Sequence, residues 1–228
     1  MISFVEENYL KALFQLSGED GEVNVKDLSE ELGIKMSTVT SMMKKFAEKG
    51  LVHYESYRPL RLTGKGKKEA GLVLRKHRLT EMFLVERMGF GWEEVHEIAE
   101  QVEHVHAPAF FEKMSELLGH PKMDPHGSPI PDKEGNLEWK EYDKLSDCQP
   151  GDRFVLQAIM KSEDEFLAHL NKRDLRLGLE LHVESVAPFD GSMQVNYEGR
   201  TGEVLSHTVC ERLLGKRMGE VEELRVEG

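Results

Sequence analysis

A stretch rich in proline and glycine divides the chain between residues 119 and 151. Five of the eight prolines lie there, at positions 121, 125, 129, 131 and 150, and glycines stand close to them. Both residue types interrupt helices and strands, so a cluster of them marks a connection between folded parts. Since 228 residues are enough for two modest domains, we predict a Pro-rich linker at residues 121–148 with folded parts before and after it.

Residues 1–72 show the order of elements that is typical of a winged helix-turn-helix domain. Hydrophobic spacing and flanking glycines predict helices at residues 4–16, 25–32 and 37–48. Two short apolar segments separated by a turn, at residues 51–54 and 60–62, predict the strands of a β-wing. Because such a domain inserts a recognition helix into the major groove, this order predicts binding to double-stranded DNA.

The distribution of charge supports the same prediction. The net charge of the chain is -12, which taken alone argues against a nucleic-acid partner. Residues 35–78, however, hold twelve Lys or Arg against three acids, a net of +9, and the remaining 18 bases and 39 acids give -21. One basic segment on an acidic chain is the expected electrostatic pattern of a DNA-binding module, although a solvated basic face would show the same pattern.

The predicted DNA contacts lie on the third helix and on the wing. Short polar side chains at the start of a recognition helix suit base edges, and lysine and arginine suit phosphates. The candidates are Lys35, Ser37, Thr38, Thr40, Ser41, Lys44, Lys45 and Arg58.

Residues 63–118 carry side chains that can bind a metal ion. We predict helices at residues 63–88, 92–106 and 108–118. Spacings of three, four, seven and eight place His96, Glu100, Glu103 and His104 on one helical face, and His77 and Glu81 repeat the four-residue step. Each alone is compatible with an ordinary acidic or half-buried surface. Imidazole and carboxylate ligands without a thiolate favour Mn²⁺ or Fe²⁺, although zinc can also bind them.

The part after the linker is predicted to be a small β domain of about 70 residues. Turn signals separate predicted strands at residues 153–160, 180–185, 193–197 and 201–205, with a helix at residues 163–170. Acids rather than bases follow Met1, and no apolar run approaches the roughly 20 residues of a membrane span. We therefore expect a cytoplasmic protein without a membrane partner.

Three segments give the chain a resemblance to a known family. Residues 75–81, 96–104 and 125–131 read RKHRLTE, HEIAEQVEH and PHGSPIP. In these segments the chain resembles the diphtheria toxin repressor and manganese transport regulator family of metal-dependent transcription repressors. The resemblance implies a mainly α protein with a winged helix-turn-helix domain, a helical metal-binding and dimerisation domain and a small SH3-like (FeoA-like) β-barrel. These parts correspond to residues 1–72, 73–120 and 149–218, and residues 219–228 form a tail.

The resemblance also assigns metal ligands. It implies an ancillary site of His77, Glu81 and His96, and a primary site of Glu100, Glu103 and His104. Asn8 stands where the family takes a further primary-site ligand from the first helix, and Glu165 is the candidate ligand from the SH3-like domain. Because manganese-sensing members carry Glu where Glu100 stands, the resemblance favours Mn(II). Fe(II) is a possible activator, and Zn(II) or Co(II) are expected to bind in vitro.

These observations predict a homodimeric, Mn(II)-activated repressor of metal-uptake genes. They predict no enzymatic activity and no small organic substrate, since no activated nucleophile or phosphate-binding loop is visible. Two alternatives stay open. One is a winged-helix regulator that responds to Fe(II) or to a small molecule, and the other is a hydrolytic metalloenzyme, which would leave the wing and the basic segment unexplained.

Overall fold

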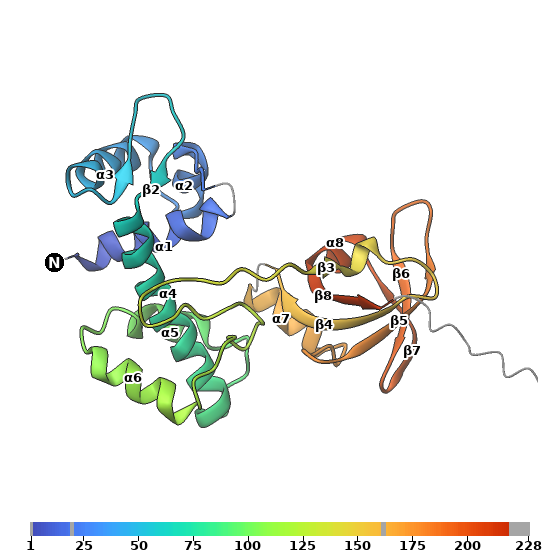
Figure 1. The fold of residues 1–228 in the computed structure, drawn as a ribbon. Coiled ribbons are helices and arrows are strands. Elements are labelled where there is room, and N and C mark those ends of the chain that lie inside the picture. Colours follow the sequence, from blue (N-terminus) through green and yellow to red (C-terminus); the bar gives the residue numbers. More distant parts are fainter. Residues whose placement is uncertain (1, 19–20, 161–162, 219–228) are drawn as a thin grey trace, which may run out of the picture. The chain divides into compact units, whose positions relative to one another are not determined.

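The computed structural model describes residues 2–18, 21–160 and 163–218 (Figure 1). They form two compact units. Unit 1 contains the residues up to Phe90 with Val95–Asp124 and Pro129–Glu138, and unit 2 contains Gly91–Glu94, Pro125–Ser128 and the residues from Trp139 onward. The predicted tail at residues 219–228 lies outside the described residues. Across the described ranges, no helix has the length and apolar character needed to cross a bilayer.

Unit 1 begins with the predicted three helices and wing. These are α1 (Phe4–Ser17), α2 (Val25–Glu31), α3 (Met36–Glu48), β1 (Val52–His53) and β2 (Arg61–Leu62). The two strands pair in antiparallel fashion, with Val52 opposite Leu62. Residues from all three helices form one buried core, which includes Leu10, Leu13, Leu28, Val39, Met43 and Phe46. This core fixes α3 against α1, so the polar side of α3, the predicted recognition helix, faces outward.

Helix α4 (Gly64–Phe83) is the long helix predicted from residue 63. Thr63 caps this helix, because its Oγ1 accepts a hydrogen bond from the backbone N of Gly66 at 3.0 Å. The helix continues into one π-helical turn, η1 (Leu84–Met88), so its predicted end is also right. Helices α1, α5 and α6 all contact α4, which makes α4 the element on which the rest of unit 1 is assembled.

The predicted helix at residues 92–106 is shorter in the structure. It is α5 (His96–Val102), followed by α6 (Pro108–Leu117). The backbone N of Gly91 donates to the Glu94 carboxylate at 2.8 Å, and the backbone N of Glu94 donates to Gly91 O at 3.0 Å. This tight turn prevents a helix from starting at Trp92. At the other end, the N of Glu103 still donates to Ala99 O at 2.9 Å, so the helical path continues to Glu103.

Part of the segment predicted to be a linker is packed on unit 1. Residues Pro129–Glu138 run beside α4, where Arg75 donates to Pro131 O at 2.9 Å. Gly71 permits this contact, because a Cβ atom at that position would lie 2.0 Å from Gly135 O. Ile130 completes a small core with Leu79, Phe111 and Met114.

Unit 2 is built on an antiparallel sheet of six strands in the order β3-β8-β4-β5-β6-β7 (Figure 1). Its core contains Phe154, Leu156, Leu181, Val183, Val195 and Leu213. The four predicted strands and the predicted helix are present, whereas β3, β8 and α8 were not predicted. The elements are β3 (Asp143–Lys144), η2 (Leu145–Asp147), β4 (Arg153–Ile159), α7 (Asp164–Asn171), β5 (Glu180–Val186), β6 (Met193–Tyr197), β7 (Arg200–Leu205), α8 (His207–Arg212) and β8 (Leu213–Met218).

Candidate metal centre

The ligands predicted in unit 1 lie on α4, on α5 with the two residues that follow it, and on α1, and these elements pack together. Helix α4 supplies His77 and Glu81, α5 supplies His96 and Glu100, and Glu103 and His104 follow directly after α5. Their side chains form one connected cluster, which we call the His/Glu cluster, and α1 closes it with Glu7, Asn8 and Lys11.

His77 lies at the centre of the part that was predicted as the ancillary site. Its Nε2 is 3.0 Å from Glu81 Oε1, and its Nδ1 is 2.6 Å from Glu103 Oε2. The Nδ1 of His96 lies 3.4 Å from Glu81 Oε1, and its Nε2 lies 3.5 Å from Glu100 Oε1. One donor atom from each of His77, His96 and Glu100 lies within 4.8 Å of the other two, so these side chains are close enough to share one ion.

The surroundings of His77 control its protonation. Burial would lower the pKa of this imidazole, but its hydrogen bonds to the carboxylates of Glu103 and Glu81 outweigh burial and raise the pKa to about 9. At neutral pH the ring is therefore protonated and donates from both nitrogens. Without a metal ion, an imidazolium charge neutralises part of the acidic cluster.

The part predicted as the primary site contains two buried atoms without a hydrogen-bond partner. They are Asn8 Oδ1 and His104 Nε2. His104 donates from Nδ1 to Glu7 Oε2 at 2.6 Å, and its Nε2 lies 3.4 Å from Glu103 Oε1. Buried polar atoms normally have partners. An imidazole held by a carboxylate at one nitrogen and open at the other is the arrangement of a metal-binding histidine, so these residues fit a divalent cation.

Two residues of the cluster, Glu7 and Lys11, were not predicted from the sequence. Glu7 orients His104 and also lies 3.3 Å from Lys76 Nζ. Lys11 Nζ donates to Glu100 Oε1 at 2.5 Å and to both oxygens of Glu103 at 2.8 and 2.9 Å. Their four-residue spacing places Glu7 and Lys11 on one face of α1. That spacing was visible in the sequence, but nothing local indicates that this polar face is buried against α5.

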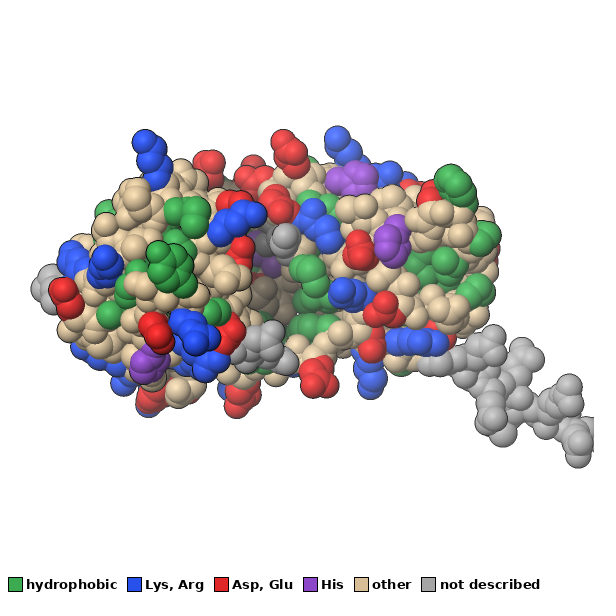
Figure 2. Space-filling model, turned by 90° about the horizontal axis from the view of Figure 1, so that it is seen from above, with side chains coloured by type: hydrophobic (Ala, Val, Ile, Leu, Met, Phe, Trp, Pro, Cys, Tyr) green, Lys and Arg blue, Asp and Glu red, His purple; other side chains and the backbone are tan. Residues whose placement is uncertain are grey.

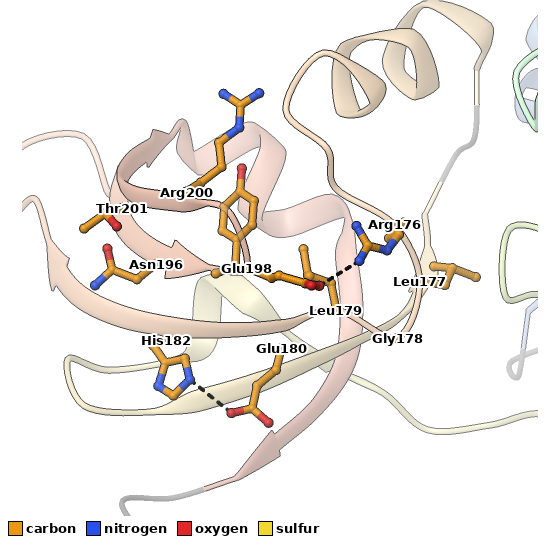
Figure 3. Close-up of a pocket in the computed structure, with 11 residues that line it drawn as sticks. Arg176, Leu177, Gly178, Leu179, Glu180, His182, Asn196, Glu198, Arg200 and Thr201 are labelled. Atoms are coloured by element: carbon orange, nitrogen blue, oxygen red, sulfur yellow. Dashed lines mark hydrogen bonds and ion pairs between the residues drawn. The ribbon is translucent and has the colours of Figure 1, made fainter.

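Glu165, the ligand predicted from the SH3-like domain, lies in the exposed first turn of α7 in unit 2, and its role stays a prediction. Unit 2 also has a hollow of about 550 Å³ that is lined by the segment entering β5, by β5 itself and by the β6–β7 turn. Its charged side chains have ionic partners: Arg176 pairs with Glu198 at 2.8 Å and His182 with Glu180 at 3.0 Å (Figure 3), and Arg200 pairs with Asp174 at 2.7 Å. These pairs leave little charge for a ligand, so the His/Glu cluster is the stronger candidate site.

The predicted DNA-contacting side chains are on the surface of unit 1. Lys35, Ser37, Thr38, Ser41, Lys44, Lys45 and Arg58 are exposed and Thr40 is half-buried. Basic and acidic side chains are interspersed on the face drawn in Figure 2. Lys45 of α3 and Lys49, which caps the C-terminal end of α3, lie 3.0 and 2.6 Å from Glu6 Oε1, so α1 is ion-paired to the predicted recognition helix and its cap. Burial would raise the pKa of Glu6, but Lys49 and the other donors lower it to about 2.

Comparison with known protein families agrees with this arrangement. Residues 1–60 match the family described as "Iron dependent repressor, N-terminal DNA binding domain". Residues 63–132 match "Iron dependent repressor, metal binding and dimerisation domain", and residues 144–216 match the FeoA domain. The three matches confirm the predicted fold class, with a DNA-binding domain, a helical domain and an SH3-like domain in that order.

Individual relatives are similar over different lengths. The iron-dependent repressor IdeR of Mycobacterium leprae is 35% identical over 125 residues, which are 55% of this chain and 54% of that protein. The chain thus spans about half the length of such curated relatives. The diphtheria toxin repressor of Corynebacterium diphtheriae is 27% identical over 220 residues, which are 89% of this chain and 94% of that protein.

Solved structures extend the similarity to nearly the whole chain. A manganese-dependent transcriptional repressor in complex with manganese has a TM-score of 0.83 at 29% identity, covering 93% of this chain and 99% of that chain. The structure of ScaR with bound Zn²⁺ has a TM-score of 0.75 at 28% identity, covering 93% and 98%. Together with the two repressor domains matched over residues 1–60 and 63–132, these similarities show that the chain belongs to the diphtheria toxin repressor family of metal-dependent transcription repressors.

Proposed function

We propose that this protein is a cytoplasmic, homodimeric repressor that binds the operators of metal-uptake genes when Mn(II) is available. One observation carries this proposal: α1 is bonded on one side to the recognition helix and on another side to the His/Glu cluster. Glu6 pairs with Lys45 of α3 and with Lys49, which directly follows α3, whereas Lys11 pairs with Glu100 and Glu103. A change in the His/Glu cluster therefore acts on α1 and, through the ion pairs of Glu6, also on α3.

The residues of the cluster have separate tasks in this mechanism. Glu100, Glu103, His104 and Asn8 would hold an ion of the primary site, and His77, Glu81 and His96 one of the ancillary site. A bound divalent cation supplies positive charge that is shared between ligands from α1, α4 and the α5 region. The Glu7 carboxylate accepts a hydrogen bond from Nδ1 of His104 at 2.6 Å. The other ring nitrogen, Nε2, is thereby directed away from Glu7. The outcome is a fixed position of α1, and with it of α3, relative to α5.

The donor set favours Mn(II). Within the described cluster, the donors are carboxylate, amide and imidazole groups, and the two cysteines of the chain, Cys148 and Cys210, are buried in unit 2. Hard oxygen donors suit manganese, whereas soft metals prefer thiolates. Relatives include iron-dependent repressors and a manganese-dependent one, so activation by Fe(II) is the second candidate.

Dimerisation is proposed to use the exposed side of α6. Phe110 and Leu117 are large apolar residues that are 47% and 51% exposed, although Phe111 between them is buried. Exposed aromatic and aliphatic side chains on one helix are typical of a protein interface. Two copies joined through α6 would present two recognition helices, as two half-sites about one DNA turn apart require.

Fluorescence anisotropy with a labelled uptake-gene operator tests the proposal. We expect Mn²⁺ to increase DNA affinity about 5- to 150-fold, the usual range of allosteric coupling, and a chelator to reverse this. Glu100→Ala should lose the metal response, whereas Glu112→Ala, which removes an exposed carboxylate of α6, should keep it. Equal affinity with Mn²⁺ and with chelator would contradict the proposal. Repeating the titration with Fe²⁺, Co²⁺ and Zn²⁺ ranks the activating metals.

A further inference from the structure

Lys11 is a buried cation placed between the carboxylates that are expected to hold the metal ion. Its side chain is 8% exposed, and its ammonium group contacts three carboxylate oxygens within 2.9 Å. Two of these oxygens belong to Glu103, which is fully buried, and the third belongs to Glu100. An ammonium group with three donors is therefore saturated by the oxygens of two predicted primary-site ligands.

We propose that Lys11 is a tethered competitor of the metal ion, and that it sets the metal concentration at which the protein responds. This inference rests on the proposed function, because it assumes that Glu100 and Glu103 are ligands. The ammonium group occupies the lone pairs that a divalent cation needs. A metal ion bound to the same oxygens would lie next to the ammonium charge, and two cations at such short distance repel strongly in a poorly solvated site. Lys11 must therefore leave its position when metal binds.

The cost of this displacement appears as weaker metal binding. Only molecules in which Lys11 has moved away can bind the ion, so the apparent dissociation constant equals the intrinsic constant divided by the fraction of such molecules. Lys11 is attached to α1 and cannot diffuse away. Its competition is therefore constant and independent of the surrounding salt to a first approximation. A lysine in this position raises the concentration threshold and leaves the ligand set unchanged.

Lys11 has a structural role as well, since its ion pairs join α1 to Glu100 of α5 and to Glu103, which directly follows α5. A purely structural lysine would stabilise the fold, but its removal would not improve metal binding. The two roles are therefore separated by the direction of the change in metal affinity. Loss of a structural contact weakens binding or leaves it unchanged, whereas loss of a competitor strengthens binding.

Isothermal titration calorimetry with Mn²⁺ on the full chain tests the inference. We expect Lys11→Met, which keeps the aliphatic chain and removes the charge, to bind Mn²⁺ about 10- to 100-fold more tightly than the wild type. Lys11→Arg, which keeps the charge, should stay close to the wild type. Lys26→Met is the charge-matched control, because Lys26 is 70% exposed and pairs with Glu30 on α2, and its affinity should not change.

Unchanged or weaker Mn²⁺ binding by Lys11→Met would overturn the inference. Glu103→Gln separates this failure from failure of the proposed function. If the wild type binds Mn²⁺ and Glu103→Gln does not, the site is right and only the role of Lys11 is wrong. If no form binds Mn²⁺, both proposals are overturned.

A measurement on the wild type avoids dependence on a folded Lys11→Met variant. Lysine labelled at Nζ can be followed by nuclear magnetic resonance while diamagnetic Zn²⁺ is added. We expect one buried ammonium signal, assigned through its loss in Lys11→Arg, to move to the position of solvated lysines as the site fills. A signal that keeps its buried position at saturating Zn²⁺ would refute the displacement.

Discussion

Replacing Glu103 by glutamine is expected to destabilise unit 1 in the absence of any metal. The carboxylate is fully buried and accepts hydrogen bonds from two cationic groups, Lys11 Nζ at 2.8 and 2.9 Å and His77 Nδ1 at 2.6 Å. Glutamine keeps the volume and removes the charge. Both cationic groups then lose a buried partner, which is more costly than replacing a whole ion pair by apolar side chains.

The size of the effect follows from the structure. A tenfold change in proton affinity is worth about 1.4 kcal/mol, so a pKa of about 9 instead of 6.5 at His77 corresponds to a net gain of roughly 3 kcal/mol, in which the two carboxylate partners outweigh the opposing effect of burial. Losing Glu103 removes one of the two carboxylates that raise this pKa, and with it part of this free energy. Lys11 keeps Glu100 as a partner, so its loss is partial and adds roughly 1–2 kcal/mol. We therefore expect a loss of about 2–4 kcal/mol in the free energy of unfolding.

Urea unfolding with excess chelator measures this loss. Both tryptophans, Trp92 and Trp139, belong to unit 2, so far-ultraviolet circular dichroism is the appropriate signal for the helices of unit 1. Glu112→Gln is the matched control, because Glu112 pairs with Arg75 at 3.4 Å with a half-exposed side chain, and such pairs contribute at most about 1 kcal/mol. A Glu103→Gln protein within about 0.5 kcal/mol of the wild type, roughly the change expected of a neutral surface substitution, would refute this account of the cluster.

Three further predictions concern pH, α1 and the dimer. The pKa of His77 is higher in the folded protein than its ordinary value of 6.5, so the stabilisation by its protonated ring is complete below pH 6.5. The chelator-treated protein should lose stability as pH rises through about 9. Thermal melts at several pH values measure this loss. Glu6→Gln removes the partner of Lys49 and Lys45 and should lower the free energy of unfolding by about 1–2 kcal/mol at neutral pH. In the wild type this contribution is present above about pH 4.5 and is lost as pH falls through about 2. The urea midpoints of the two proteins should therefore converge in acid. Phe110→Glu should weaken self-association by roughly 30-fold or more, as loss of a central aromatic contact does, and sedimentation equilibrium measures this with Glu112→Gln as a control that leaves the dimer intact.

The sequence predicted those features that depend on local periodicity. The three N-terminal helices, the wing, the start of the long helix near residue 63 and the four-residue steps of the His/Glu face all follow from neighbours within one or two turns. The main error in this region was the start of α5, where a turn at Gly91–Glu94 replaces the first helical turn. The acidic residues of this segment are compatible with a helical turn and with the observed tight turn, so the sequence pattern did not distinguish the two conformations.

Features that depend on distant residues were not predicted. Strand β8 contains Gly215, and glycine is a residue that local propensity disfavours in strands. In the sheet this glycine lies against β4, where a Cβ atom would be 2.0 Å from Val155 O, so the pairing itself requires the glycine. Lys11 was missed for a similar reason. Its neighbours Leu10 and Leu13 mark the apolar face of α1, and nothing within α1 shows that the opposite face is also buried.

The charges of the His/Glu cluster determine what metal binding must accomplish. Glu7, Glu81, Glu100 and Glu103 bring four carboxylates into a largely buried region, where the ammonium groups of Lys11 and Lys76 and the protonated His77 ring balance them. The cluster is therefore not an unpaired acidic site that needs an ion in order to fold. An entering metal exchanges with the protein's own cations, and the net electrostatic gain is small. A sensor built in this way can stay folded without metal. It responds when the concentration of the metal ion is high enough for the ion to displace the protein's own cationic groups.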